Sequence, residues 1–577
     1  MNQHDAAVPP VPGAKSPPSR ARALHVGALC DFVDEASGCD FPITVDHLSS
    51  LMGLLAGAGV QTLSWAHYAD DQGGPLLPAV PNAHRTYQHL GNAFARAVAA
   101  AHAEKLRIFG YFKPYEMAAD MVFPEGSPEA KESGLLDRIG GRTGWADPFV
   151  AAHPQCCIQH RSRAFPQPNR DEPICSIKLI KSDDGPTRIQ RENLQIWSSR
   201  DNYRYQQLPV DFGLSESIET AGSDVHTLAD GIVTRVGDRV RVLTLTGLNL
   251  SERCILVTTN FTDGEGDFAN ASTSLLRMYD QNGREIPGCF ANGKPIYHAD
   301  RADFRHWGLM FDTGYGLRTC VLDVPNASGR AGFIAFIRGR SPHLGAPCET
   351  EPRVQEYWLD RVEQMLDDGA DGIEFRIENH STHTDFPTEY GFNQAVLDRL
   401  ADPAHPTLAQ IAKVRGDAYT EFLVQAKKRI AARGKELRLN FELDALRPDP
   451  PPRRLLAYPA NMEMQWQRWL DLAQPDEVVF RHYGLSFDEI LQDEPTARIA
   501  AACLAKGIPI HFNRYIRDQE ADRILRDVDT IRADLRFSGY VFYEVCSYIQ
   551  YHPDGICTFR IPAVPKAMRL AGRPASP

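Results

Sequence analysis

The stretch Asp371-Gly-Ile-Glu-Phe-Arg-Ile-Glu-Asn-His380 alternates between apolar and ionisable side chains. Successive side chains of a β-strand point to opposite faces, so the two kinds separate. One face would carry Ile373, Phe375 and Ile377, and the other Glu374, Arg376, Glu378 and His380. Four ionisable groups in a row are costly to bury unless they pair or serve a function. The stretch therefore predicts a barrel strand whose apolar face packs on helices while its polar face points inward.

The same division recurs in the run 437–444, where the inward set would be Arg438, Asn440, Glu442 and Asp444. Outward from these two runs, short β-branched and aromatic segments alternate with helical ones, which is typical of parallel strands joined by crossover helices. The eight expected strands are 24–32, 61–68, 106–112, 372–380, 437–444, 477–483, 508–514 and 539–545. Eight strand–helix units close a (β/α)8 TIM barrel. A doubly wound open sheet is the alternative, but the chain has no Gly-x-Gly-x-x-Gly and no P-loop motif.

The barrel rhythm stops between residues 144 and 342, where short alternating strands and hairpin signals such as Asn282-Gly283 appear. This pattern predicts an antiparallel, sandwich-like β domain inserted after the third barrel strand. The barrel would then occupy residues 21–143 and 343–560, with a disordered tail at 1–20 and a C-terminal tail at 561–577. The insert would shape the substrate cleft or make an oligomer contact; an accessory carbohydrate-binding module is the other interpretation.

The bulk composition argues against several classes of protein. The 577 residues carry a formal charge of -12, with 43% hydrophobic and 24% charged residues, which is typical of a folded globular protein and unfavourable for nucleic-acid binding over the whole surface. No run of about 18 apolar residues and no secretory signal is evident, so we expect no membrane contact and a cytoplasmic location. The 12 cysteines lack Cys-x-x-Cys spacing and are expected to be reduced.

Candidate catalytic residues follow from the strand ends, because barrel enzymes place their chemistry at the carboxyl ends of the strands. Glu378 would end the fourth strand and Glu544 the eighth, on opposite sides of the mouth. Paired carboxylates across a cleft suit glycosidic bond cleavage, one as acid and one as nucleophile or base. Glu442 is the substitute for either, and an ion-pair network that merely fills the barrel is the structural alternative.

Other strand ends, beginning with Asp31, supply aromatic rings that stack on sugars and polar groups that bind hydroxyls. These substrate-binding candidates are Trp65, His67, Lys113, Tyr115, Glu116, Arg376, Asn379, His380, Asp444, Arg481, His482, His511, Asn513 and Tyr543.

The segments Gly369-Ala-Asp-Gly-Ile-Glu-Phe-Arg-Ile-Glu-Asn-His380 and Glu389-Tyr-Gly-Phe-Asn393 resemble the glycosyl-hydrolase-like TIM-barrel proteins of bacteria, loosely the family-10-like group, mainly over Arg353–Val545. The resemblance implies a carbohydrate substrate, an acid/base after the fourth strand and a nucleophile ending the seventh. The chain departs from that pattern: it has Glu378-Asn379 in place of Asn-Glu, and Asn513-Arg514 without a carboxylate.

Two other functions compete with a glycoside hydrolase. A divalent-metal-dependent barrel isomerase, lyase or hydrolase would take its ligands from Glu378, His380, Glu442, Asp444, His482 and His511. A carbohydrate-binding protein without catalysis is the other. The first function needs no cofactor or metal, the second needs a divalent ion, and a homo-oligomer is open under all of them.

Overall fold

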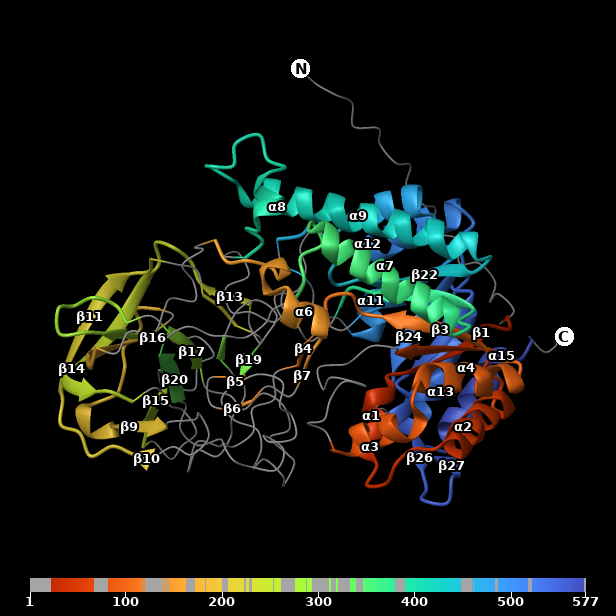
Figure 1. The fold of residues 1–577 in the computed structure, drawn as a ribbon, viewed down its shortest axis with the longest axis horizontal. Helices are drawn as coiled ribbons and strands as arrows, with labels where there is room; N and C mark the ends of the chain where they lie inside the picture. The colour runs from red at the N-terminus through yellow and green to blue at the C-terminus, as the bar shows by residue number, and fades with distance from the viewer. Residues whose placement is uncertain are drawn as a thin grey trace.

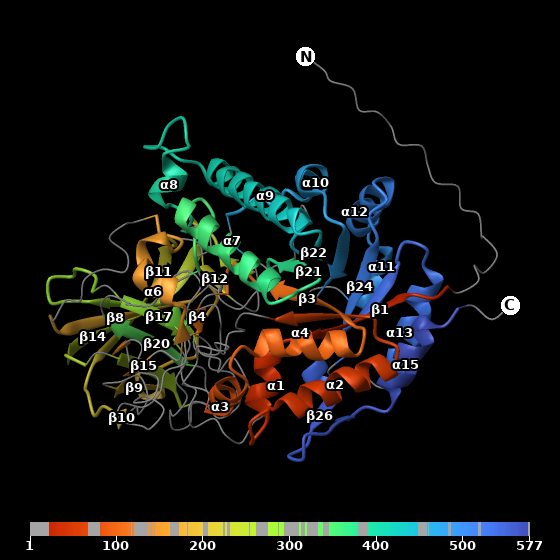
Figure 2. The same ribbon diagram turned by 45° about the vertical axis from the view of Figure 1, so that its right-hand side comes forward.

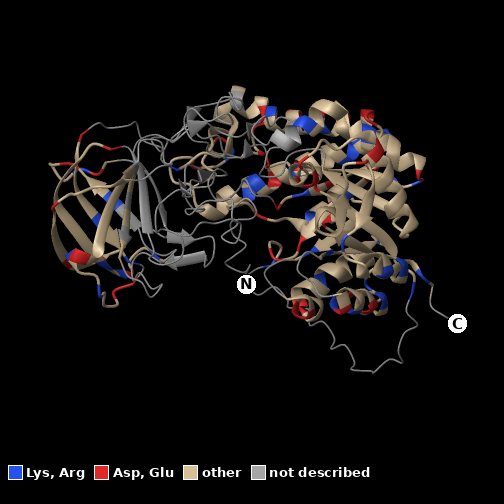
Figure 3. Cartoon of the chain, turned by 90° about the horizontal axis from the view of Figure 1, so that it is seen from below, with Lys and Arg blue, Asp and Glu red and all other residues tan. Residues whose placement is uncertain are grey.

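A closed barrel of eight parallel strands forms one lobe of the computed structural model, and antiparallel sheets form the other (Figure 1). The structure describes residues 22–66, 81–116, 118–119, 137–138, 141–142, 145–161, 172–181, 183–199, 206–222, 225–227, 231–252, 254–260, 275–286, 288–292, 311–312, 318–319, 333–338, 346–378, 390–447, 459, 461–482, 486–516 and 521–574. Figure 3 shows acidic and basic residues intermixed over both lobes.

The barrel strands follow one another in the order β1-β2-β3-β21-β22-β23-β24-β25, which confirms the predicted (β/α)8 architecture. Their bounds are β1 His25–Cys30, β2 Thr62–Ala66, β3 Arg107–Phe112, β21 Gly372–Arg376, β22 Glu436–Glu442, β23 Glu477–Arg481, β24 Ile510–Tyr515 and β25 Gly539–Tyr543. Six of them lie within the expected runs. The other two extend one residue beyond: β22 begins at Glu436, before the expected 437, and β24 ends at Tyr515, after the expected 514.

Helices cover the outside of the barrel (Figure 2). They are α1 Phe32–Gly38, α2 Val45–Gly57, α3 Pro81–Leu90, α4 Ala93–Ala103, α7 Pro352–Asp367, α9 Leu408–Ala432, α11 Phe487–Gln492, α12 Glu494–Ala505, α13 Ala521–Ala533, α14 Val545–Tyr548 and α15 Ala563–Gly572. The longest, α9, begins at a capping box of Thr407 and Gln410. Outward-facing strand residues such as Val26, Ile373 and Phe480 are fully buried against this helical layer.

The Gly-x-x-Gly pattern before β21 has a steric cause. Gly369 ends the turn after α7 with φ +100°, a left-handed conformation that favours glycine. Gly372 begins β21 so close to its neighbours that a Cβ atom would lie 2.3 Å from the Phe109 ring and 2.5 Å from the Glu436 carbonyl oxygen. Both glycines therefore serve the entry into the fourth barrel strand.

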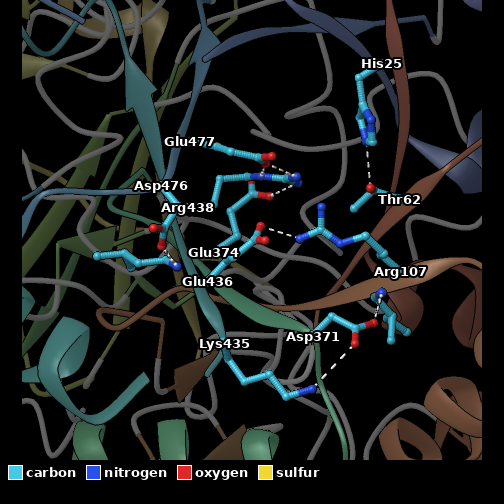
Figure 4. A network of polar contacts seen from close by, with 12 residues as sticks. His25, Thr62, Arg107, Asp371, Glu374, Lys435, Glu436, Arg438, Asp476 and Glu477 are labelled. Carbon is cyan, nitrogen blue, oxygen red and sulfur yellow. Dashed lines mark hydrogen bonds and ion pairs between the residues drawn. The ribbon is translucent and has the colours of Figure 1, made fainter. Parts of the chain in front are cut away.

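The lower, amino-terminal part of the barrel interior is filled by an ion-pair network (Figure 4). Arg438 donates through Nε to Glu477 at 2.9 Å and through Nη1 to Glu374 at 3.2 Å. Glu374 also accepts from the Ser64 hydroxyl at 2.6 Å and from the Asn440 amide at 3.1 Å. We call this set, together with His25 and His511, the lower network.

The second lobe lies in sequence between β3 and β21, as predicted for the insert. One sheet has the order β11-β14-β8-β16 and the other β10-β9-β15-β20-β17. Their bounds are β8 Ile174–Ile180, β9 Leu194–Ser199, β10 Gln206–Gln207, β11 Gly213–Thr220, β14 Arg239–Leu250, β15 Cys254–Thr259, β16 Leu275–Tyr279, β17 Gly288–Asn292 and β20 Phe333–Arg338. Residues of both sheets, among them Ile177, Leu245, Ile196 and Val257, share one apolar core, so the two sheets form a sandwich. The domain limits at residues 144 and 342 stay predictions.

Among the described helices, none combines the length and the hydropathy that crossing a bilayer requires.

Candidate active site

The upper, carboxyl-terminal part of the barrel interior gathers ionisable side chains from most of the strands. Strand alternation turns Asp31, Tyr111, Lys113, Arg376, Glu378, Glu442, Arg481 and Tyr543 to the inside, and all of them are less than a tenth exposed. We call this set the upper cluster. Its residues come from β1, β3, β21, β22, β23 and β25 or the positions directly after them.

Arg481 joins two carboxylates at the centre of the upper cluster. Its Nε lies 3.0 Å from Glu378 Oε2 and 3.5 Å from Glu442 Oε2. Because both oxygens contact the same nitrogen atom, the distance between them cannot exceed the sum of these two contacts. That upper limit equals the shortest carboxylate separation found in inverting glycosidases, about 6.5 Å. Glu378 Oε2 also accepts from Arg376 Nη2 at 2.9 Å. Two guanidinium groups thus stabilise the ionised form of the Glu378 carboxyl group.

The two guanidinium groups stay charged despite complete burial. Burial alone would lower the pKa of Arg376, but Tyr111, Glu378 and Tyr543 hold that pKa well above its usual range. Burial and the neighbouring Arg376 would both lower the pKa of Arg481, and Glu378 and Tyr543 raise it instead. Both arginines are therefore permanent cations in the floor of the mouth.

Tyr543 links this centre to the first strand. The Arg481 guanidinium lies 4.5 Å above the Tyr543 ring centre, a cation–π contact. The Tyr543 hydroxyl is 3.5 Å from Asp31 Oδ2. Lys113 forms ion pairs with Asp31 at 3.3 Å and with Glu116 at 3.1 Å. Burial and the charge of Glu544 raise the pKa of Tyr543 well above its usual range, so its hydroxyl remains protonated.

The described contacts of Glu544 are with residues outside the upper cluster. Its Oε2 accepts from the Cys546 thiol at 3.1 Å, and ligand-type atoms of Asp34, Glu544 and Cys546 all lie within 4.8 Å of one another. These residues belong to α1, the end of β25 and α14. The pairing of Glu378 with Glu544 across the mouth stays a prediction, whereas Glu378 and Glu442 are brought together by Arg481.

Several other candidates lie away from the upper cluster. Trp65 faces outward and packs on Phe32 with ring centres 4.6 Å apart. Tyr115 is buried under the helices, where its hydroxyl donates to Glu349 at 3.1 Å. His482 also faces the helical side, 5.7 Å from the Phe512 ring centre.

His511 belongs to the lower network rather than to the mouth. Its ring centre lies 5.2 Å from that of His25, which begins β1. Burial, with the nearby Arg438 charge, lowers the pKa of His511 to about 3, so the ring is neutral. The sequence analysis expected His511 at the carboxyl end of its strand, where substrate would bind. It is instead the second residue of β24 and lies at the amino-terminal end of that strand.

The remaining candidates divide by placement. Asn513 and Asp444 are buried on the inward faces of β24 and of the segment after β22, while His67, Asn379 and His380 lie outside the described residues. The sequence reasoning missed Tyr111, which is fully buried on the inward face of β3. Its position two residues before Lys113 on one strand was the signal that could have found it.

No family model and no curated protein matches the sequence. Solved structures that resemble it include glycoside hydrolases. The glycoside hydrolase domain of PelA from Pseudomonas aeruginosa is 12% identical, with 45% of this chain and 77% of that chain covered and a TM-score of 0.21.

A chitobiase from Flavobacterium johnsoniae is 10% identical, with 97% of this chain and 49% of that chain covered and a TM-score of 0.34. A 2-naphthoyl-CoA reductase is 9% identical, with 90% and 47% covered and a TM-score of 0.30. Likenesses this distant carry no weight for the reaction, and the specific similarity to family 10 stays a prediction.

Proposed function

We propose that the chain is a glycoside hydrolase whose paired carboxylates are Glu378 and Glu442. The observation that carries this proposal is the Arg481 Nε atom, which lies 3.0 Å from one carboxylate and 3.5 Å from the other at the catalytic end of the barrel. Two carboxyl groups about 5 to 5.5 Å apart are the arrangement of retaining enzymes. The close approach of Glu378 and Glu442 supports retention of configuration.

The two glutamates have different neighbours, which suggests their roles. Glu378 Oε2 lies 2.9 Å from Arg376 Nη2 and 3.0 Å from Arg481 Nε, whereas Glu442 Oε2 lies further from Arg481 Nε, at 3.5 Å. We therefore assign Glu378, which has the closer guanidinium contacts, as the nucleophile and Glu442 as the acid that protonates the leaving oxygen. This reverses the acid/base role that the resemblance implied for Glu378.

In the proposed reaction Glu442 gives its proton to the glycosidic oxygen while Glu378 attacks the anomeric carbon from the opposite face. The resulting glycosyl ester is cleaved by water, and Glu442 takes the proton of that water. Arg481 stays within reach of both groups and stabilises whichever of them is negatively charged. The tyrosine ring beneath it holds the guanidinium in place.

The metal-dependent alternative fits these residues less well. Two of its expected ligands, Glu378 and Glu442, already share the cationic Arg481, which repels a divalent ion. Two others, His482 and His511, lie on the helical side and in the lower network. The non-catalytic alternative does not explain why two buried carboxylates converge on one guanidinium at the barrel mouth.

The test is covalent trapping. A panel of 2-deoxy-2-fluoro glycosides with good leaving groups is incubated with the protein, and peptides are examined by mass spectrometry. We expect one glycosyl adduct on the peptide that contains Glu378, and none on the Glu378→Gln variant. An adduct on Glu442 would exchange the two roles, and an adduct on Glu544 would replace the pair.

The matched control is Glu544→Gln, which changes a buried carboxylate near the mouth whose described partner is Cys546. It should keep turnover of whichever glycoside the panel identifies, whereas Glu442→Gln should lose it and regain it only with leaving groups that need no proton. Turnover that survives in both Glu378→Gln and Glu442→Gln would overturn the proposed function.

A further inference from the structure

The guanidinium groups of the upper cluster have hydrogen-bond donors that the described protein does not fill. Arg376 uses Nη2 on Glu378, but its Nε and Nη1 atoms are buried and have no acceptor among the described residues. The same holds for Arg481 Nη1 and for the hydroxyl of Tyr111. Arg376 is 3% exposed, Arg481 4% and Tyr111 0%. Leaving charged donors buried without an acceptor is unfavourable.

These donors belong to one group of neighbours. Arg376 and Arg481 both contact Glu378 Oε2, at 2.9 and 3.0 Å, and Tyr111 lies on β3, which pairs with the strand β21 that carries Arg376. Both cations also act to lower the pKa of Tyr111, which burial raises to about 12. The two arginines also repel each other, since Arg376 acts to lower the pKa of Arg481. An anionic group between them would fill the empty donors and relieve this repulsion. A neutral hydroxyl would do only the first.

We infer that Arg376, Arg481 and Tyr111 form a subsite for a sugar carboxylate, so that the substrate contains a uronic acid residue. The inference rests on the proposed function and names its substrate class. A guanidinium presents a planar fork of donors that matches a carboxylate, and the phenol adds a third, uncharged donor. The subsite adjoins Glu378 through Arg376, so the carboxylate belongs to the sugar ring that is cleaved or to its immediate neighbour.

The acidic residues nearby do not compete for these donors. Asp31 and Glu116 form their ion pairs with Lys113. Glu378 is the carboxylate that both guanidinium groups contact, and its Oε2 atom takes one donor from each. Arg376 Nε, Arg376 Nη1 and Arg481 Nη1 therefore remain for the carboxylate of the substrate.

The experiment compares binding of matched monosaccharides to the full chain by calorimetry. Glucuronate and galacturonate are the probes, and glucose, galactose and glucose 6-phosphate are the references. We expect at least one uronate to bind tenfold or more tightly than its neutral counterpart. Equal binding of uronate and neutral sugar, or tighter binding of the phosphate, would overturn the inference.

Two tyrosine variants provide the matched pair. Tyr111→Phe removes the hydroxyl that we assign to the subsite, and Tyr540→Phe removes another buried hydroxyl without a described partner, on the helical face of β25. Tyr111→Phe should weaken uronate binding by about three- to tenfold, and Tyr540→Phe should leave it unchanged. Arg376→Lys, which keeps the charge but not the fork, should weaken it further; equal affinity in Tyr111→Phe and the unsubstituted protein contradicts the inference even if Arg376→Lys is unstable.

The failure of this inference is distinguishable from failure of the proposed function. Trapping of Glu378 by neutral fluoro-glycosides but not by fluoro-uronides would leave the hydrolase in place and refute the carboxylate subsite. Uronate binding without any trapping or turnover would support the subsite and refute the hydrolase.

Discussion

The two ends of the barrel interior contain the same kinds of residue but satisfy them to different degrees. In the lower network every guanidinium nitrogen of Arg438 has an acceptor. In the upper cluster Arg376 has an acceptor for one nitrogen of three. A buried arginine whose donors are all filled by protein holds strands together, whereas one with unfilled donors has capacity for a ligand. By this criterion the lower network has a structural role, and the upper cluster has a role in binding a ligand.

The largest expected effect comes from making the same change, Glu to Gln, at two positions on the inward face of β21 and its continuation. One position belongs to the upper cluster and the other to the lower network. Glu378→Gln should lower kcat by about 10³-fold or more, because the nucleophile is lost, and should also lower stability by roughly 2 to 3 kcal/mol, because it weakens buried contacts with Arg376 and Arg481. Glu374→Gln should lower stability by roughly 2 to 3 kcal/mol, because it weakens a buried charge-assisted pair with Arg438, and should leave kcat within about twofold.

The measurements are steady-state kinetics on the identified glycoside and urea unfolding followed by circular dichroism. The comparison is wrong if Glu374→Gln loses turnover as severely as Glu378→Gln while it remains folded.

A second change tests the lower network from its other partner. Arg438→Gln leaves Glu374 and Glu477 buried without their shared cation, and breaking a buried ion pair in this way costs about 3 to 5 kcal/mol. We expect the midpoint of urea unfolding to fall accordingly. Arg433→Gln, which removes an exposed ion pair with Glu363, is the control and should leave the unfolding midpoint almost unchanged.

The pH dependence of stability sharpens the comparison further. Burial lowers the pKa of His511 to about 3 and that of His25 to about 4, whereas both titrate near 6.5 in the unfolded chain. The unfolded state therefore binds protons first, so stability is complete above pH 6.5 and falls as the pH drops toward 4. Burial alone would raise the pKa of Glu477, but Arg438 lowers it to about 2, so its contribution is lost below about pH 4.5.

Unfolding free energies measured by urea at pH 7, 6, 5 and 4 should thus decrease steadily. His511→Asn should reduce the slope between pH 6 and 4 by up to about 1.4 kcal/mol per pH unit, the value for one proton. An unchanged slope would show that His511 does not enter the network as a neutral ring.

The smallest expected effect concerns Ser64, whose hydroxyl donates to Glu374. Ser64→Ala should lower stability by about 1 to 2 kcal/mol through the lost charge-assisted hydrogen bond and should not alter kcat or KM. Any change in KM would mean that the lower network and the upper cluster are coupled.

Much of this could be predicted from the sequence, and the limits have physical causes. The recurrence of short β-branched and aromatic segments between helical ones located all eight barrel strands, and strand alternation put Arg376, Glu378 and Glu442 on inward faces. It also argued against Trp65, which neighbours the inward-facing Ser64, but proximity to a strand end outweighed that signal. Depth along the interior depends on the stagger between strands, which one sequence does not reveal, and His511 was misplaced for that reason.

The two arginine contacts of Glu378 differ in how far the sequence could predict them. Arg376 is two residues away on the same strand, so alternation brings it near. Arg481 comes from β23, and its reach to two carboxylates depends on the register of β22 with β23, in which Glu442 lies opposite Arg481. Such pairings between strands follow from the closed barrel rather than from any local pattern.

The position of the β lobe between β3 and β21 has a consequence for synthesis on the ribosome. The first three barrel strands emerge early, yet β3 pairs next with β21 and β1 pairs with β25, the last barrel strand. The β3 edge of this early sheet remains unpaired until β21 has been made, and the β1 edge until almost the whole chain has been made. Open edges invite association with other chains. The sandwich contains its own core and can fold while the early strands wait, so nascent-chain handling, more than equilibrium stability, should limit the yield of this protein.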